Sequence, residues 1–75
     1  MNITVKEVAD CIRDLLPKSI VYEIPNLDKV GVDVPPLSLY IYDNHISLFH
    51  GQSLMNPVLF RSLFDLQDWI VTNLL

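Results

Sequence analysis

The residues best suited to acid–base chemistry lie together in one short stretch, Tyr42-Asp43-Asn44-His45. An imidazole beside a carboxylate and a phenol can hold or transfer a proton near neutral pH. Catalysis by such a group also needs a nucleophile or an oxyanion donor, and the neighbouring sequence offers neither. We therefore predict that His45 is a surface histidine beside a turn and that the chain is not an enzyme.

The single cysteine, Cys11, is the other candidate nucleophile. Reactive thiols have a lowered pKa, typically because a helix N-terminus or a cation lies beside them. Cys11 is expected more than one turn into a helix, near Asp10 and Asp14, whose charges disfavour a thiolate. We predict a structural thiol. One cysteine also excludes a disulfide framework and, with charged residues where a signal peptide would be apolar, indicates a cytoplasmic protein.

Metal and cofactor signatures are lacking in the sequence. His45 and His50 are five positions apart, so within one strand they would point to opposite faces and could not share a metal ion. There is no glycine-rich phosphate loop, no HExxH, no CxxC and no EF-hand spacing. We predict that the protein uses no metal and no cofactor.

The charge distribution disfavours nucleic acid and membrane as partners. Nine acidic and five basic residues give a formal net charge of −4, and the basic residues are scattered singly. Nucleic-acid binding depends on lysines and arginines that neutralise phosphates. The apolar uncharged run Val34–Tyr42 is much shorter than the roughly 20 residues of a membrane-spanning helix. We predict no direct nucleic-acid binding and no membrane span.

The apolar content is high for a chain of 75 residues, which we expect to form one domain, residues 1–75. Hydrophobic residues make up 51% of the sequence and charged residues only 19%. A domain of this size has too little interior to bury all of them. We therefore expect an exposed apolar surface, which favours self-association or binding to another protein.

The central stretch 37–50 predicts a β-hairpin. Two strands, Leu37–Tyr42 and His45–His50, flank Asp43-Asn44, a pair that tolerates the positive φ angles of two-residue turns. With that turn, Tyr42 lies opposite His45 and Ile41 opposite Ile46. The same register pairs Tyr40 with Ser47, Leu39 with Leu48, and Ser38 with Phe49.

This register separates an aliphatic face from an aromatic one. The aliphatic face is the expected core side and holds Leu37, Leu39, Ile41, Ile46 and Leu48. Aromatic side chains are enriched where proteins meet, so the other face provides the candidate partner-binding residues Tyr40, Tyr42, His45 and Phe49. The alternative is that these rings only stabilise the sheet by cross-strand packing. A register slip of one residue would exchange the two faces.

Helices are expected at both ends. Thr4 and Glu7 form a capping box, and an apolar stripe follows until Pro17; the charged side of this helix is expected to be solvated. A second capping pattern predicts Asp65 as N-cap and Asp68 at N3 of the last helix, with Phe64 and Trp69 as a hydrophobic staple. The predicted apolar stripes are Val5, Val8, Ala9, Ile12, Leu15 and Leu16 in the first helix, and Leu66, Trp69, Ile70 and Leu74 in the last.

Between the helices, the alternation of Ser19–Ile24 predicts a further strand. Val30–Val34 alternates in the same way, although residues 25–36 could instead form one irregular loop. Residues 57–63 could form a last strand or a helical turn, and the strand is favoured. The fold class is thus α+β: a two-layer antiparallel β-meander of three to five strands, with both helices on one sheet face.

Two functional hypotheses follow. The first is a small non-enzymatic protein-protein interaction module, homodimeric, that uses the aromatic sheet face. The alternative is an acidic inhibitor of the phage or mobile-element type that blocks a nucleic-acid-binding site on a host protein. Its basis is the row formed by Glu7, Asp10 and Asp14 on one helix face, which Lys6 and Arg13 interrupt.

Overall fold

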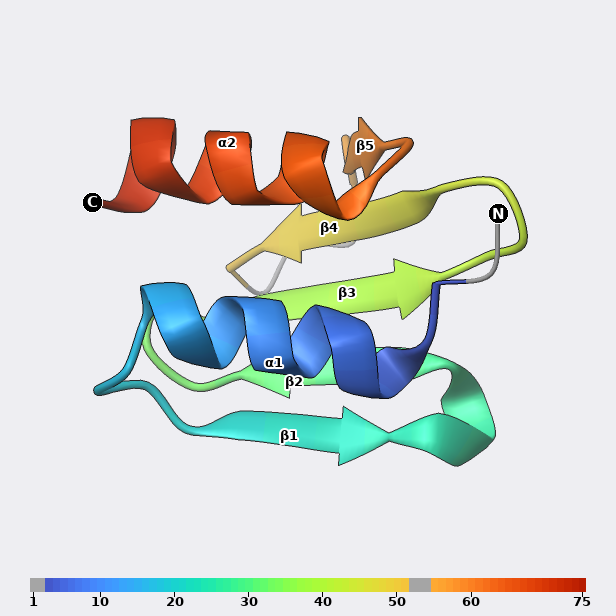
Figure 1. Cartoon of the computed structure of the whole chain (residues 1–75), viewed down its shortest axis with the longest axis horizontal. Helices are drawn as coiled ribbons and strands as arrows, with labels where there is room; N and C mark the ends of the chain where they lie inside the picture. Colours follow the sequence, from blue (N-terminus) through green and yellow to red (C-terminus); the bar gives the residue numbers. More distant parts are fainter. Residues whose placement is uncertain (1–2, 52–54) are drawn as a thin grey trace.

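The computed structural model describes residues 3–51 and 55–75. A helix, five strands with one short 3₁₀ helix between the first two, and a second helix follow in chain order (Figure 1). Their bounds are α1 Val5–Leu15, β1 Val21–Ile24, η1 Pro25–Leu27, β2 Lys29–Val32, β3 Leu37–Ile41, β4 Ile46–His50, β5 Val58–Phe60 and α2 Leu63–Leu74.

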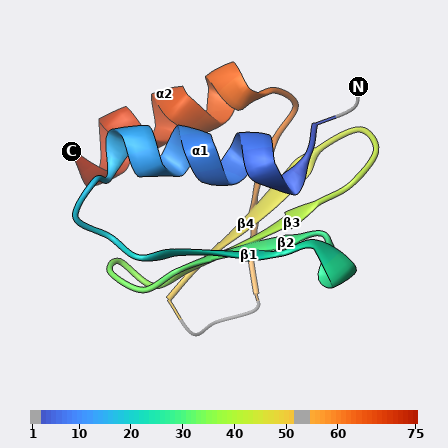
Figure 2. The ribbon, with the colours of Figure 1, turned by 60° about the horizontal axis from the view of Figure 1, so that its bottom comes forward.

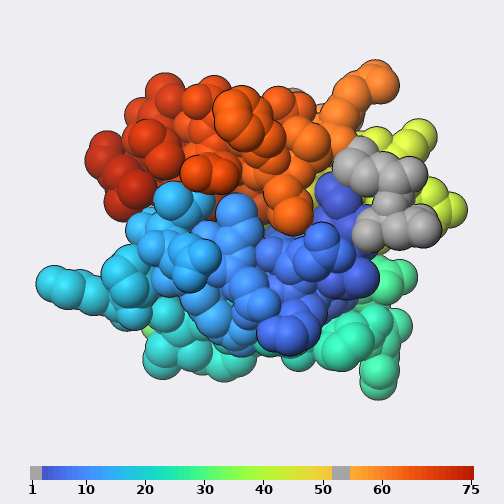
Figure 3. All heavy atoms as spheres, viewed as in Figure 1, coloured from blue at the N-terminus to red at the C-terminus, as the bar shows by residue number. Residues whose placement is uncertain are grey.

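The five strands form one antiparallel sheet in the order β1-β2-β3-β4-β5. Both helices lie on the same side of this sheet, and within residues 3–51 and 55–75 no helix covers the other side (Figure 2). In the space-filling view α1 and α2 lie side by side over the strands (Figure 3). The predicted two-layer α+β meander is confirmed, with the largest number of strands that the sequence allowed.

The central hairpin has the predicted register. Ile41 pairs with Ile46, and Tyr40 with Ser47. Each strand is one residue shorter than predicted, because Tyr42 and His45 belong to the turn, where the Tyr42 N–H donates to the His45 carbonyl at 2.9 Å. The expected positive φ angles are wrong for this turn: among the described residues other than glycine, only Asp28 and Asn56 have positive φ. Asp43 and Asn44 both have negative φ, where the main allowed backbone regions of L residues lie.

Strands form in both segments for which the sequence allowed an alternative, residues 25–36 and residues 57–63. β2 occupies Lys29–Val32 within residues 25–36, and η1 forms the turn before it. β5 is a short strand, Val58–Phe60, within residues 57–63. β1 begins at Val21, later than predicted, because Ser19 and Ile20 bond instead to the turn before β3. There the Asp33 carboxylate accepts the Ile20 N–H at 2.8 Å, and the Ser19 hydroxyl donates to the Val34 carbonyl. The sequence also indicates a connector between β4 and β5, Gln52–Asn56, and most of it lies outside the described residues.

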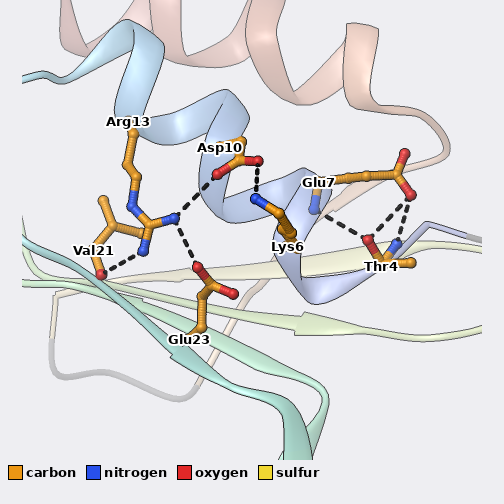
Figure 4. Close-up of polar contacts among 7 residues, drawn as sticks. All are labelled: Thr4, Lys6, Glu7, Asp10, Arg13, Val21 and Glu23. Atoms are coloured by element: carbon orange, nitrogen blue, oxygen red, sulfur yellow. Dashed lines mark hydrogen bonds and ion pairs between the residues drawn. The ribbon is translucent and has the colours of Figure 1, made fainter.

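α1 begins as its capping box predicts. The Thr4 hydroxyl accepts the Glu7 N–H at 3.1 Å, and the Glu7 carboxylate accepts the Thr4 N–H at 3.3 Å (Figure 4). These bonds satisfy helix N–H groups that would otherwise lack a partner. The helix turns its predicted apolar stripe to the core, where Val8, Ala9 and Ile12 are completely buried.

α2 begins three residues earlier than predicted. Its N-cap is Ser62, whose hydroxyl accepts the Asp65 N–H at 3.1 Å, so Asp65 lies at N3 and is not the N-cap. Both residues are good caps, and the earlier one extends the helix by almost one turn. The expected staple is absent as a consequence, and Phe64 is 75% exposed. The apolar stripe was predicted correctly: Leu66 and Ile70 are fully buried, and Trp69 and Leu74 pack partly buried against the core.

The hydrophobic core lies between the helices and the covered face of the sheet. All five aliphatic residues of the hairpin's predicted core face are buried. Strand alternation places them on one side, where burying each side chain contributes about 1.5–3 kcal/mol before entropy costs. The buried hydrophobic residues are Val8, Ala9, Ile12, Leu16, Val30, Val32, Leu37, Leu39, Ile41, Ile46, Leu48, Phe60, Leu66 and Ile70.

The free edge of β1 is closed by a side chain of α1. Carbonyls of successive strand residues point to opposite sides. The Ile20 carbonyl accepts the Asp33 N–H from the β2 side, so the Val21 carbonyl points to the free edge. Arg13 donates to that carbonyl at 3.2 Å and pairs with Glu23 at 2.7 Å (Figure 4). The charged side of α1 is therefore not simply solvated: Arg13 occupies an edge where a foreign strand could add.

We predict that Arg13→Ala opens this edge. The variant should assemble beyond the wild-type state, because an unguarded edge strand presents free N–H and C=O groups to other chains. Light scattering over a concentration series measures the effect. Lys18→Ala is the control, since it removes an equal charge away from the strand. Identical scattering for Arg13→Ala and the wild type would show that Arg13 does not guard the edge.

Candidate interaction surface

The sheet face turned away from the helices, here called the open face, is the candidate functional surface. The strand pairing determines which residues it presents. Among the described strand residues on this face, Lys29 alone is charged. The strand residues of the open face are Tyr22, Ile24, Lys29, Gly31, Ser38, Tyr40, Ser47, Phe49 and Leu59.

At the centre of the open face, Tyr40 is held by contacts on two sides. Its ring meets the Phe49 ring edge to face, with centroids 5.7 Å apart. The Lys29 ammonium lies 5.2 Å from the Tyr40 ring centroid on the neighbouring strand, a cation–π arrangement. Ser47, the cross-strand partner of Tyr40 and Leu59, is only 6% exposed because larger side chains flank it. The rings thus form an ordered platform.

At the turn end of the open face, Tyr42 stacks on His45. The ring centroids are 4.6 Å apart and the ring planes are inclined by 18°. The His45 Nδ1 lies 2.7 Å from the Asn44 Oδ1. An amide oxygen only accepts hydrogen bonds, so Nδ1 carries a hydrogen and Nε2 faces away from this contact. Tyr42 is 53% exposed, and its ring is available to a partner.

The four residues predicted from the sequence all lie on this face and form two contacting pairs, Tyr40 with Phe49 and Tyr42 with His45. Their role in binding stays a prediction. Sequence reasoning missed other members of the face, of which Tyr22 is 52% and Leu59 is 61% exposed. A signal for Lys29 was present, since residues that alternate with the apolar Val30 and Val32 must face away from the core.

Gly31 leaves room for the ring of Tyr22 on the open face. A Cβ built at Gly31 would lie 3.8 Å from Tyr22 Cδ2, an ordinary van der Waals distance. Gly31 also has no positive φ. The residue is therefore replaceable, and its flexibility costs folding entropy.

We predict that Gly31→Ala raises the free energy of unfolding by about 0.5–1 kcal/mol, because alanine restricts the unfolded chain and fits the native strand. Urea denaturation measures the change. Gly51→Ala is the matched control: Gly51 has φ +77, where a side chain is strained, so this variant should lose stability. A loss of stability in Gly31→Ala would show that the Tyr22 contact is tighter than the structure indicates.

The remaining chemistry-bearing residues do not assemble into a site. Cys11 is half-buried, and burial, followed by the charge of Asp14, raises the pKa of its thiol, which keeps it protonated and unreactive. His50 lies on the helix side of the sheet with its ring against Trp69. The described residues contain no cluster of three or more side chains suited to a metal ion. None of their helices has the length and apolarity to cross a membrane.

Comparisons with protein-family models, with curated proteins and with solved structures returned no significant match to this chain.

Proposed function

We propose that the chain is a small non-enzymatic, cytoplasmic protein-protein interaction module that forms a homodimer through its open face. The observation that carries the proposal is the composition of that face. It combines exposed and half-exposed aromatic rings with a single charged strand residue, in a chain whose net charge is −4. Aromatic enrichment and depletion of charge distinguish the centre of a protein interface from ordinary surface.

The size of the face agrees with this proposal. The principal axes of the molecule measure 27, 25 and 23 Å. A stable specific interface buries about 800 Å² on each partner, which is of the order of one whole face of a molecule with these dimensions. A second copy stacked face to face would cover such an area, whereas a single added strand at an edge would not.

The edges support a face-to-face arrangement in another way. Arg13 occupies the edge of β1, and β5 offers only three strand residues at the opposite edge. Edge pairing of two copies would therefore have few free backbone groups to use. Two sheets packed through their faces need no free backbone groups, because side chains make the contact.

The mass of the wild-type protein in solution tests the proposal. We expect light scattering to report twice the 8.6 kDa chain at high concentration and a return to one chain on dilution. A single-chain mass throughout an accessible concentration range would count against the homodimer.

The alternative of an acidic inhibitor stays untested, and the ion pairs of α1 do not favour it. Asp10, in the middle of the acidic row, is paired with Lys6 at 2.8 Å and with Arg13 at 3.1 Å. The hydrogen bond from Lys6 is the main cause that lowers the pKa of Asp10. A carboxylate whose charge is balanced by two neighbouring cations contributes little to the repeating negative charge that would imitate a nucleic-acid backbone.

A further inference from the structure

A small pocket lies at the corner of the open face, where the β3–β4 turn meets the end of β5. Asn44, His45, Leu59 and Arg61 line it, and its volume is about 220 Å³. Tyr42 stacks on His45 and limits the movement of the imidazole. Two nitrogen-rich side chains, His45 from the β3–β4 turn and Arg61 from the residue after β5, are thus brought to one hollow beside the aromatic platform.

Arg61 has no anionic partner in the described part of the chain. The ion pairs found there join Lys6 and Arg13 to Asp10 and Glu23. Arg61 is exposed, and its guanidinium is always charged and suited to bidentate bonds with an oxyanion. The Asn44 contact places a hydrogen on Nδ1 of His45, so Nε2 is the nitrogen that can meet a ligand, and it donates to an anion only when the imidazole carries a second hydrogen.

We propose that this corner binds a carboxylate group presented by the second copy of the chain in the homodimer. The inference rests on the proposed function, and it adds a polar contact at the rim of an aromatic interface. Charge complementarity supports this occupant. The strand residues of the open face include no carboxylate, but Asp43 is exposed in the β3–β4 turn at its rim, so a second copy can present a carboxylate to the Arg61 guanidinium.

A carboxylate, which carries one negative charge, fits this corner better than a phosphate. The protein's net charge of −4 opposes any incoming anion, and it opposes a dianion more strongly. Leu59 provides an apolar wall, which suits the hydrocarbon part of an Asp or Glu side chain. The guanidinium of Arg61 can donate two parallel N–H groups to the two oxygens of one carboxylate, and the imidazolium form of His45 adds a donor at Nε2.

An NMR titration of the isotopically labelled wild type with sodium acetate, at constant ionic strength, tests the site. We expect saturable shifts at the His45 ring and the Arg61 Nε–H. Arg61→Gln should weaken acetate binding about tenfold or more, as a lost charge-assisted hydrogen bond predicts. Lys18→Gln, a matched loss of charge elsewhere, should leave it unchanged. Shifts that do not saturate, or that Arg61→Gln leaves intact, would overturn the site. Tighter binding of inorganic phosphate than of acetate would overturn the choice of a carboxylate.

The dissociation constant of the dimer provides a second test. We expect Arg61→Gln and His45→Gln to raise the dimer dissociation constant, by about tenfold for Arg61→Gln. A wild-type dimer that both variants leave equally tight would overturn this inference while the proposed function stands. A monomeric wild type would instead overturn the proposed function and, with it, the second copy as the source of the carboxylate. The acetate titration would then still show whether the corner binds carboxylates.

Discussion

Replacing Leu39 with alanine should remove about 2–5 kcal/mol of folding free energy. Leu39 is on β3, the central strand, and its side chain is completely buried between the sheet and the helices. A 75-residue domain has a total stability of about 4–11 kcal/mol, so this single change should leave a large unfolded fraction. Urea denaturation followed by circular dichroism measures it.

The control for this prediction is Leu27→Ala. Leu27 is the same residue type in η1, but it is 62% exposed. Its truncation removes little buried area and should change stability by less than about 0.5 kcal/mol. Equal losses for the two variants would contradict the position of the core between helices and sheet.

Changing Tyr40 and Tyr42 together to serine should weaken the dimer about 30-fold or more. The two rings occupy the centre and the turn end of the open face, where truncating an aromatic residue commonly costs 1 kcal/mol or more of binding free energy. A combined loss of about 2 kcal/mol corresponds to that factor. The fold should persist, since neither ring belongs to the core between sheet and helices. Sedimentation equilibrium measures the association, and circular dichroism verifies the fold.

Phe64→Ser is the matched control for the tyrosine variant. Phe64 is an aromatic residue of α2 that is 75% exposed, on the opposite layer of the molecule. Its loss removes a similar apolar area from the surface and should leave the dimer unchanged. Dissociation by Phe64→Ser, with an intact dimer in the tyrosine variant, would place the interface on the helices.

The hairpin could be predicted from sequence because two independent signals agreed on it. Residue alternation assigned Leu39 and Leu48 to one face, and the polar pair Asp43-Asn44 set the register. The conformation of the turn was wrong, and each strand is one residue shorter than predicted. Short-range patterns determine pairing between adjacent strands, whereas the φ angles of a turn depend on contacts such as the stacking of Tyr42 on His45.

The start of α2 was misplaced because two adjacent capping patterns competed. Ser62 with Asp65 and Asp65 with Asp68 are both acceptable starts, and local propensity barely distinguishes them. The structure uses the earlier one, which leaves Phe64 in solvent. Sequence alone could not resolve this choice, because both residues are good N-caps.

The wider candidate surface could be identified only from the complete strand order. Tyr40, Tyr42, His45 and Phe49 followed from one hairpin, but Arg61 reaches the same corner only through the pairing of β5 with β4. The role of Arg13 was also not predictable, since it joins α1 to Val21 and Glu23 across separate elements. Contacts between separate elements are set by tertiary packing, and a pattern within one element does not encode them.

The most direct test of the central claim is an isotope-filtered NOE measurement on a mixture of labelled and unlabelled protein, which detects only contacts between copies. The open-face dimer predicts intermolecular NOEs from the rings of Tyr22, Tyr40 and Phe49. Intermolecular NOEs confined to Phe64 and Val71 of α2, in a protein of dimeric mass, would contradict it.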